Sequence, residues 1–352
     1  MITIQARNVH EALKSGMQFL DEHGVERDSR VGKVRVIDGP VTTLYHAPRE
    51  RVVFWPERDA NPFFHFMEGL WMLAGRNDVA WISQFAKSME QFSDDGITFH
   101  GPYGYRWINH FAKQIEPDPE VPEHAGGFYV PFNQLEMIVE MLRENPHERR
   151  CVLQMWDPEV DLGRKGKDVP CNTQIYLKLG IDGRLDMTVC NRSNDIVWGA
   201  YGANAVHMSM MQEFVASWLG VEVGRYWQIS NDWHGYIDVL EKHRAILETD
   251  DGPFNYPYFG GRKGKERVEP FPMVNGPIDQ WLGDLEMFMS EGPVPGFRDR
   301  FFKKVVVPMW NSWWVWKDKE NPRRVDEALE HADRIAASDW RLACVEWLER
   351  RR

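Results

Sequence analysis

Residues 169–195 read VPCNTQIYLKLGIDGRLDMTVCNRSND, and the pattern of this stretch organises the residues on either side of it. Apolar residues alternate before and after Asp182-Gly183, a dipeptide that favours a tight turn between two antiparallel strands. The alternation predicts a β-hairpin with Cys171 just before its first strand and Arg192 just after its second. Because a hairpin brings the outer ends of its strands together, we expect the Cys171 thiol and the Arg192 guanidinium to converge.

This convergence favours a cysteine nucleophile. A thiol attacks only as the thiolate, and a neighbouring guanidinium lowers the thiol pKa. A lone cysteine is more often buried and inert, but the Pro170-Cys171 turn and the downstream Arg192 reverse that balance here. We therefore predict an enzyme that acts on a phosphorylated small molecule. The other cysteines lack this context and are expected to be structural: Cys151, Cys190 and Cys344.

The rest of the chain mixes helical and strand patterns. Asn61 and Pro62 have the residue types preferred at a helix start. Apolar residues at helical spacing predict helices, and a short alternating run predicts one more strand. The predicted helices cover residues 8–23, 62–74, 203–219 and 236–247, and the strand covers 225–230. Together with the hairpin, these elements predict an α+β fold.

From about residue 276 onward the pattern is mostly helical. Segment 301–316 is rich in tryptophan, and we expect buried packing there rather than a base-stacking surface. Pro308 would break or kink a helix in that segment. The further predicted helices cover residues 278–289, 325–337 and 340–350. We divide the chain into a catalytic domain, 1–275, and a helical C-terminal extension, 276–352, packed on the same domain.

Composition narrows the class of protein. The chain has 352 residues, of which 43% are hydrophobic, and its formal charge is −11. Such a chain can bury a large core, and its acidity disfavours broad nucleic-acid binding. Four cysteines without a Cys-x-x-Cys pair predict neither a disulfide framework nor a metal site. No apolar stretch suits a signal peptide or a membrane span, so we expect a cytoplasmic protein.

Six motifs in order resemble those of the thymidylate synthase family, which includes the pyrimidine nucleotide hydroxymethylases. The resemblance extends over about residues 60–240 and is weak in the last hundred residues. It implies the family's sheet with packed helices. The motifs are Glu68-Gly69-Leu70-Trp71, Gly101-Pro102-Tyr103-Gly104, Arg149-Arg150 with Trp156, Pro170-Cys171, Arg192-Ser193-x-Asp195 and Asp232-x-His234-x-Tyr236.

The resemblance implies one-carbon transfer to C5 of a uracil deoxynucleotide, dUMP, with 5,10-methylenetetrahydrofolate as co-substrate. Cys171 would add to C6 of the base. Glu68 would be the general acid/base that organises water and protonates O4, and Tyr103 would assist removal of the C5 proton. Asp195, counted with the catalytic residues, would bind the pterin of the folate. From the helical pattern alone, Glu68 lies at the edge of the apolar arc, where a cleft carboxylate and a surface carboxylate look alike.

Arginines suit the phosphate of the nucleotide, because a guanidinium grips phosphate through two parallel hydrogen bonds. Arg192 and Ser193 are the first candidates. The resemblance implies that Arg149 and Arg150 reach across the interface of a homodimer into the partner's site, although alone they would be an ordinary surface pair. Arg30, in a loose match to a family motif, is a fifth candidate.

Asn204 falls where the family reads the pyrimidine edge. Its amide can donate to O4 and accept from N3–H, which is the uracil pattern, whereas relatives that use cytosine carry an aspartate. His234 and Tyr236 match the pair that binds the sugar 3′-hydroxyl. Counted forward from Asp195, the segment 198–204 is one residue longer than the usual family spacing, so a cytosine nucleotide, dCMP or CMP, stays open.

Departures from the synthases bear on the product. Met89 and Phe92 stand near positions where the synthases place tryptophans beside the folate, Asn172 replaces a histidine, and the apolar C-terminal tail is replaced by helices. Both branches of the family share a methylene on C5, which hydride converts to methyl and water to hydroxymethyl. A less enclosed site favours water. We therefore favour a deoxyuridylate 5-hydroxymethylase over a thymidylate synthase.

A catalytically inactive relative with a structural or nucleic-acid-binding role is a third interpretation. Such a protein would be expected to lose the nucleophile or a phosphate-binding arginine. Cys171 and Arg192 are both retained, which disfavours it.

Overall fold

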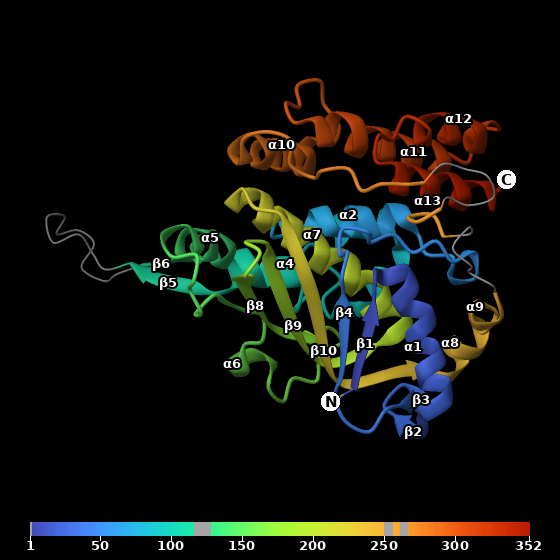
Figure 1. The fold of residues 1–352 in the computed structure, drawn as a ribbon. Helices are drawn as coiled ribbons and strands as arrows, with labels where there is room; N and C mark the ends of the chain where they lie inside the picture. The colour runs from blue at the N-terminus through green and yellow to red at the C-terminus, as the bar shows by residue number, and fades with distance from the viewer. Residues whose placement is uncertain (1, 116–127, 250–255, 261–266) are drawn as a thin grey trace, which may run out of the picture.

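The computed structural model describes residues 2–115, 128–249, 256–260 and 267–352. These residues form an eight-stranded mixed sheet in the order β1-β4-β10-β9-β8-β7, with β3 and then β2 beside the far end of β10 (Figure 1). Strands β5 and β6 form a separate hairpin that projects from the body. The strands are β1 Ile2–Ala6, β2 Val25–Ser29, β3 Gly32–Val36, β4 Val41–Tyr45, β5 Ala112–Ile115, β6 Phe128–Pro131, β7 Val152–Gln154, β8 Asn172–Leu179, β9 Leu185–Asp195 and β10 Val223–Tyr236.

Helices pack on one face of the sheet and gather at one of its ends, which confirms the α+β class. Among the described residues, no helix has the length and apolar character needed to cross a membrane. The α-helices are α1 Val9–His23, α2 Pro62–Leu73, α3 Val79–Ile82, α4 Tyr103–Tyr105, α5 Gln134–Glu144, α6 Pro158–Asp161, α7 Asn204–Leu219, α8 Ile237–Lys242, α9 Ala245–Glu248, α10 Ile278–Glu291, α11 Val307–Lys317, α12 Arg324–Ala332 and α13 Ser338–Glu349.

The predicted hairpin is confirmed as β8 and β9. Ile175 pairs with Val189 and Leu177 with Met187, and all four side chains are buried on the helical side of the sheet. The strand β9 continues through Asp195, so Arg192 lies inside the strand rather than just after it. Its backbone N–H donates to the Cys171 carbonyl at 2.9 Å, which ties the two ends of the hairpin together.

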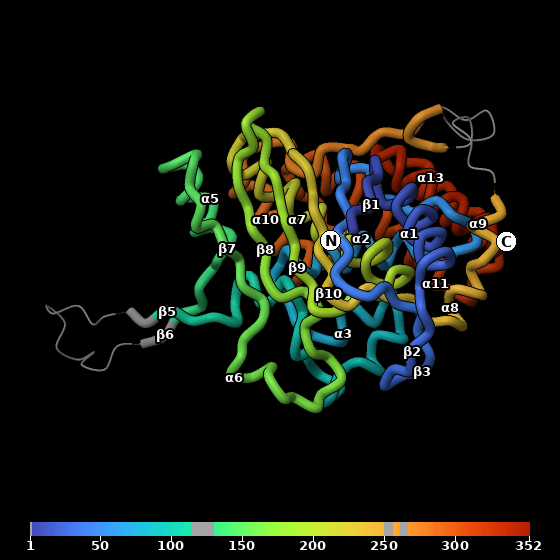
Figure 2. The backbone as a smooth tube through the Cα atoms, turned by 60° about the horizontal axis from the view of Figure 1, so that its bottom comes forward, coloured from blue at the N-terminus to red at the C-terminus, as the bar shows by residue number. Residues whose placement is uncertain are grey.

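The strand predicted over residues 225–230 is longer in the structure and runs over Val223–Tyr236 as β10. It lies parallel to β9 along its length and pairs antiparallel with β4 first and with β3 at its end (Figure 2). Three partners therefore keep it extended, and the Asp-x-His-x-Tyr motif lies on a strand. The helix predicted over 236–247 starts one residue later and is divided into α8 and α9 at His243 and Arg244.

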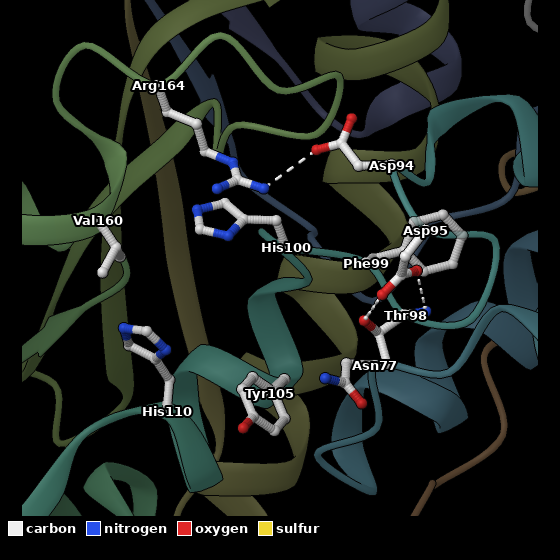
Figure 3. A pocket seen from close by; sticks show the side chains of 10 residues that line it. All are labelled: Asn77, Asp94, Asp95, Thr98, Phe99, His100, Tyr105, His110, Val160 and Arg164. Carbon is white, nitrogen blue, oxygen red and sulfur yellow. Dashed lines mark hydrogen bonds and ion pairs between the residues drawn. The ribbon is translucent and has the colours of Figure 1, made fainter.

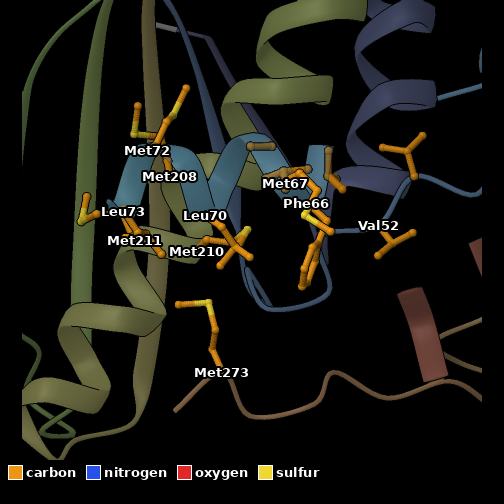
Figure 4. Packing of buried hydrophobic residues seen from close by; sticks show 14 of the residues in the cluster. Val52, Phe66, Met67, Leu70, Met72, Leu73, Met208, Met210, Met211 and Met273 are labelled. Carbon is orange, nitrogen blue, oxygen red and sulfur yellow. The ribbon is translucent and has the colours of Figure 1, made fainter. Parts of the chain in front are cut away.

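Helix α2 begins as the sequence predicts. Asn61 accepts the backbone N–H of Phe64 at 3.2 Å, and Pro62 is the first helical residue. Apolar side chains of α2 pack against a methionine-rich face of α7, which includes Met208, Met210 and Met211 (Figure 4). This contact forms the centre of the core.

Helices α10 to α13 cover α2 on the side away from the sheet (Figure 1). The chain makes a wide turn at Phe302–Val306 before α11, and Pro308 is accommodated in the first turn of α11, where its missing N–H costs no hydrogen bond. Trp313 is buried in this region, whereas Trp314 is partly exposed. The Tyr258 hydroxyl donates to Asp339 of α13 at 3.0 Å.

Candidate active site

The Cys171 thiol and the Arg192 guanidinium lie together, as the hairpin predicts. The Arg192 Nη2 is 3.7 Å from the Cys171 Sγ, and the same guanidinium donates to the carbonyls of Val169 and Pro170 at 2.9 and 2.8 Å. Burial raises the pKa of the Cys171 thiol; Arg192 opposes the rise and the Asp168 carboxylate adds to it. The net direction is opposite to the sequence-based expectation, because burial outweighs the guanidinium.

The Gly-Pro-Tyr-Gly segment connects the Cys171 turn to helix α2. A Cβ on Gly101 would lie 2.7 Å from the Pro170 Cδ, and one on Gly104 would lie 1.9 Å from the Met72 carbonyl oxygen. Both contacts exclude any side chain, so both positions require glycine. The segment thereby places Tyr103 between Cys171 and the helix that carries Glu68.

Tyr103 lies close to the nucleophile. Burial raises the pKa of the Tyr103 phenol, the neighbouring Cys171 and Asp168 groups raise it further, and hydrogen bonding to Asn172 partly offsets the rise. The phenol therefore keeps its proton near neutral pH. Asp168 accepts the Gly101 backbone N–H at 2.8 Å, and burial raises the pKa of its carboxyl.

Glu68 is buried, which resolves the ambiguity of its helical position. Its Oε2 lies 3.0 Å from the Nε2 of His207 on α7, and the two side chains are 8% and 1% exposed. The sequence analysis did not single out His207. Glu68 thus faces another titratable group in the interior rather than bulk water.

Asn204 is buried at the start of α7 and is held by a neighbour. Its Nδ2 donates to the Asn194 Oδ1 at 3.0 Å, and the Asn194 Nδ2 donates to the Ser230 Oγ at 3.1 Å. These two hydrogen bonds in series fix which end of the Asn204 amide points towards Asn194. One amide hydrogen and the carbonyl oxygen of Asn204 stay available to a base.

The segment before Asn204, where the sequence predicts one extra residue, forms a wide helical turn over Ile196–Ala203. The Asn204 backbone N–H donates to the Gly199 carbonyl, a five-residue step, and Tyr201 and Gly202 depart from helical dihedral angles. Such π turns absorb single-residue insertions within a helical segment. The Tyr201 hydroxyl lies 2.9 Å from the Thr43 hydroxyl, which anchors the turn to the sheet.

The Asp232-Trp233-His234-Gly235-Tyr236 motif lies on β10 beside the end of β9. The His234 Nδ1 is 3.1 Å from the Asp232 Oδ1, and the Tyr236 ring packs edge-on against the imidazole at 5.5 Å. Asp232 also binds Arg27 at 2.6 Å. Arg30 is exposed at the turn between β2 and β3, near enough that its charge acts on the Tyr236 phenol.

The two carboxylate oxygens of Asp195 differ, because one accepts backbone hydrogen bonds and the other has no partner among the described residues. Its Oδ1 accepts the backbone N–H groups of Val197 and Trp198 at 3.0 and 2.6 Å. Its Oδ2 is buried without a hydrogen-bond partner among the described residues, and burial raises the pKa of this carboxyl. An acceptor in this state suits a ligand with N–H donors, such as a pterin. The neighbouring Trp198 is 45% exposed and stacks on Arg58 at 4.0 Å.

The remaining expected residues lie further out. Met89 packs against the core from the short helical segment Lys87–Phe92, and Phe92 is 45% exposed. Ser193 lies next to Arg192 on β9 and is half-buried. Arg149 and Arg150 lie on the surface before β7. Within the described part of the chain, Arg150 pairs with Glu148 at 2.7 Å, and neither arginine reaches the Cys171 group.

A separate cavity of about 320 Å³ lies near α4 and α6 and is lined by none of the expected site residues (Figure 3). His100 and His110 line it, in front of the fully buried Arg106. The Arg106 Nη2 binds Asp161 at 2.9 Å and the His100 carbonyl at 3.0 Å, and His100 and His110 pair with Asp161 and Asp157 at 2.6 and 2.7 Å. We call these five residues the Arg106 network.

Comparison with known proteins decides the family. A protein-family model described as Thymidylate synthase matches residues 22–263, more than half of the chain. The chain belongs to the thymidylate synthase family. Among curated relatives of this family, a Pseudomonas phage M6 protein named Deoxyuridylate hydroxymethyltransferase is 47% identical over 100% of this chain and 95% of its own length.

More distant relatives in the thymidylate synthase family match less of the chain. A Bacillus phage SP01 protein, also named Deoxyuridylate hydroxymethyltransferase, is 33% identical over 76% of this chain and 70% of its own length. A Streptococcus suis protein named Thymidylate synthase is 26% identical over 57% of this chain and 64% of its own length. This chain is an enzyme of the family, whose members use methylenetetrahydrofolate as co-substrate.

Two side chains at this thymidylate synthase-family site escaped sequence reasoning: Asn194 and His207. For each residue, the sequence contains a feature that could have drawn attention to it. Asn194 is the variable position of the Arg-Ser-x-Asp motif, and His207 follows Asn204 by three residues in a predicted helix, so both share one helix face. Neither feature predicts the contact partner: Ser230 for Asn194, or Glu68 for His207.

Proposed function

We propose that this protein is a deoxyuridylate 5-hydroxymethyltransferase, which converts dUMP to its 5-hydroxymethyl derivative with 5,10-methylenetetrahydrofolate and water. The observation that carries the proposal is the full-length match to the phage M6 relative. That match includes residues 264–352, which lie beyond the family model, whereas the Streptococcus suis relative matches only 57% of the chain. The C-terminal helices are therefore shared with the phage M6 relative that is named a hydroxymethyltransferase. We propose that residues 276–352 are an extension of the catalytic domain.

The geometry supports a role for each group on the nucleotide. We assign Cys171 as the nucleophile at C6, with Arg192 and Ser193 on the phosphate and Arg30 as a further phosphate ligand. Asn204 would read the uracil edge. His234 and Tyr236 would bind the sugar hydroxyl, since they lie on β10 beside Asp195 at the end of β9.

The raised pKa of the Cys171 thiol means that the thiol must be deprotonated before it can add to C6 of the base. Near neutral pH the buried thiol is mostly protonated, so it must lose its proton as the nucleotide binds. Tyr103 belongs to the segment that packs against the Cys171 turn, and the same segment packs against helix α2, which carries Glu68. We propose that Glu68 organises water and protonates O4, and that Tyr103, which keeps its proton, orients the water that removes the C5 proton.

The folate supplies the one-carbon unit when it is bound. The unpaired Oδ2 of Asp195 provides an acceptor for the N–H groups of a pterin. Trp198, whose backbone N–H binds the same carboxylate, provides apolar surface beside it, and we assign Met89 and Phe92 as further folate contacts. A tryptophan wall is replaced by smaller or flexible side chains, which gives water access to the reacting carbon.

We also propose a homodimer formed through the sheet face that the helices leave uncovered. The strand registers align five side chains in one row across this face, and they are partly or fully exposed: Val152, Tyr176, Thr188, Trp227 and Leu44. The row ends on β7, two residues after Arg150. A second copy on this face would bring Arg149 and Arg150 towards the partner's site, where a phosphate would replace Glu148 as the ligand of Arg150.

Product analysis tests the proposed function. Purified protein is incubated with dUMP and 5,10-methylenetetrahydrofolate, and the nucleotide is analysed by mass spectrometry. A product heavier than thymidylate by one oxygen, with tetrahydrofolate released, is expected. Thymidylate formed mole for mole with dihydrofolate would instead establish thymidylate synthase activity. In parallel, Cys171→Ser should abolish the covalent adduct with 5-fluorodeoxyuridylate and the folate.

A further inference from the structure

Helices α2 and α7 approach closely beside Glu68. A Cβ on Gly69 would lie 2.3 Å from the Met210 Sδ, so a larger residue at position 69 would displace the Met210 side chain from this contact. Met210 lies between the two helices in Figure 4. Glu68 precedes Gly69, and His207 lies one turn before Met210 on α7. The helix crossing therefore places the Glu68 carboxylate beside the His207 imidazole.

The pair is buried but incompletely bonded. The Glu68 Oε2 and the His207 Nε2 are 3.0 Å apart, but their alignment is not that of a hydrogen bond. Among the described residues, neither atom has another hydrogen-bond partner, and the His207 Nδ1 has none. Buried polar atoms are almost always paired in native structures, so an unpaired one indicates a ligand or a reaction that uses it.

The pair also lies next to the groups that would hold the base. Asn204 is one helical turn before His207, so the side that reads the pyrimidine and the side that contacts Glu68 belong to one face of α7. One turn beyond Glu68, Met72 contacts the segment that carries Tyr103. A pyrimidine held between Asn204 and Cys171 would present its C4–C5 side towards Glu68.

We propose that His207 is a positioning residue that holds the Glu68 carboxylate for attack of water on the C5 methylene. The inference rests on the proposed hydroxymethyltransferase function. In this step the water oxygen bonds to the methylene carbon, one water proton passes to Glu68, and the electron pair of the exocyclic double bond moves onto the C4 carbonyl. The resulting enolate forms the C5–C6 double bond as the Cys171 sulfur leaves. No oxidant or reductant is required.

The titratable and charged groups around Glu68 are His65, Arg58 and His207, and of these His207 contacts its carboxylate. His65, one turn before Glu68, is buried, and burial together with Arg58 and His207 holds its pKa well below the ordinary value, so it stays neutral. Arg58 binds the Val197 carbonyl and stacks on Trp198. Within the described residues, the Glu68 carboxylate makes its close contact with His207.

Variants at His207 test the proposal because different side chains imitate different ring nitrogens. The amide nitrogen of Gln reaches the position of Nε2, that of Asn the position of Nδ1, and Phe fills the space without a donor. We expect His207→Phe to lower kcat for hydroxymethylation by tenfold or more with the KM for dUMP within threefold. His207→Gln should retain more activity than His207→Asn. Met210→Leu, at the same helix contact, is the packing control and should stay within twofold of the wild type.

Two further readouts separate positioning from loss of structure. His207→Phe should still form the 5-fluorodeoxyuridylate adduct, because Cys171 addition is unaffected. With 2-mercaptoethanol present, it should give a larger share of thioether product than the wild type, because slow hydration leaves the methylene to the added thiol. Wild-type kcat in His207→Phe would overturn the inference. So would equal losses in all three His207 variants with lost adduct and lowered melting temperature, or higher activity of His207→Asn than of His207→Gln.

Failure of the proposed function gives a different result. If the wild-type protein forms thymidylate and dihydrofolate from dUMP, the hydroxymethyltransferase assignment and this inference both fail. If it forms the hydroxymethyl product and His207→Phe forms it at the same rate, only the role of His207 fails.

Discussion

Two buried charge clusters, the Arg106 network and the Glu68–His207 pair, differ in how completely their atoms are bonded. In the Arg106 network, carboxylates, imidazoles and a backbone carbonyl surround the two terminal nitrogens of the guanidinium, and only its Nε lacks a partner among the described residues. In the Glu68–His207 pair, the facing atoms have no aligned hydrogen bond. A buried cluster with most of its polar atoms bonded stabilises one conformation, whereas a pair whose facing atoms are unbonded is available to a ligand. The difference distinguishes a structural use of buried charge from a chemical one.

The largest effect is expected from Glu68→Gln, which removes the base from the incompletely bonded pair. We expect kcat to fall by about 10²–10⁴, the usual contribution of a general acid/base. The melting temperature should be unchanged or higher, since a buried carboxylate without full bonding opposes folding. Turnover of dUMP and thermal unfolding measure the two properties. A melting temperature lowered as much as by a change in the Arg106 network would make Glu68 structural.

The Arg106 network should respond in the opposite way. Arg106→Met leaves the Asp161 carboxylate buried without its cation, which costs about 3–5 kcal/mol of unfolding free energy. Urea denaturation measures this loss. The double variant Arg106→Met with Asp161→Asn should recover part of it, because the uncompensated charge is removed. A loss below about 1 kcal/mol, the usual value of an exposed ion pair, would contradict the description of this network as structural.

Asp339 is an intermediate case with two hydrogen bonds, from the Tyr258 hydroxyl and the Trp340 backbone N–H. Burial nevertheless raises its pKa from 3.8 to about 6. The unfolded chain therefore releases this proton first, and the unfolding free energy falls between about pH 4 and pH 6 by about 3 kcal/mol. Above pH 6 the loss is complete.

Asp339→Asn should lack this decrease. Unfolding free energies of the wild type and the variant, measured by denaturant titration at pH 4, 5, 6 and 7, give the comparison. The difference between the two proteins should change by about 3 kcal/mol across this range in favour of the variant. A constant difference would show that the Asp339 carboxyl is not shifted.

The smallest effect concerns Asn194, which extends the comparison to a neutral group. Asn194→Ala frees the Asn204 amide to rotate, and we expect the preference for dUMP over dCMP to fall about tenfold, which is about 1.4 kcal/mol for one hydrogen bond. Ratios of kcat/KM measure it. Ser230→Ala, one bond further along the chain, should have a weaker effect. An unchanged preference would mean that the wide turn before Asn204 selects the base.

Sequence patterns predicted those features of the fold and the site that neighbouring residues determine. The hairpin of β8 and β9, the start of α2 at Asn61 and Pro62, and the family motifs follow from residue order and spacing. The pKa of Cys171 did not, because its direction depends on burial by segments far away in sequence. The partners of Glu68 and Asn204 were missed for the same reason: helix packing and strand pairing bring His207 and Asn194 to them. The length of β10 depends on three neighbouring strands, which no short window contains.

The parallel register of β9 and β10 has a consequence for how such a chain can change its length in evolution. Asp195 pairs with His234 and Ser193 with Asp232, so two binding motifs share one ladder. Inserting or deleting a single residue in either strand would turn every later side chain to the opposite face and remove a whole motif at once. The turn at Asp182-Gly183 lies at the distant end of the hairpin, with Ile181 fully exposed. Insertions and deletions should therefore accumulate at that turn, while the two strands tolerate only substitutions.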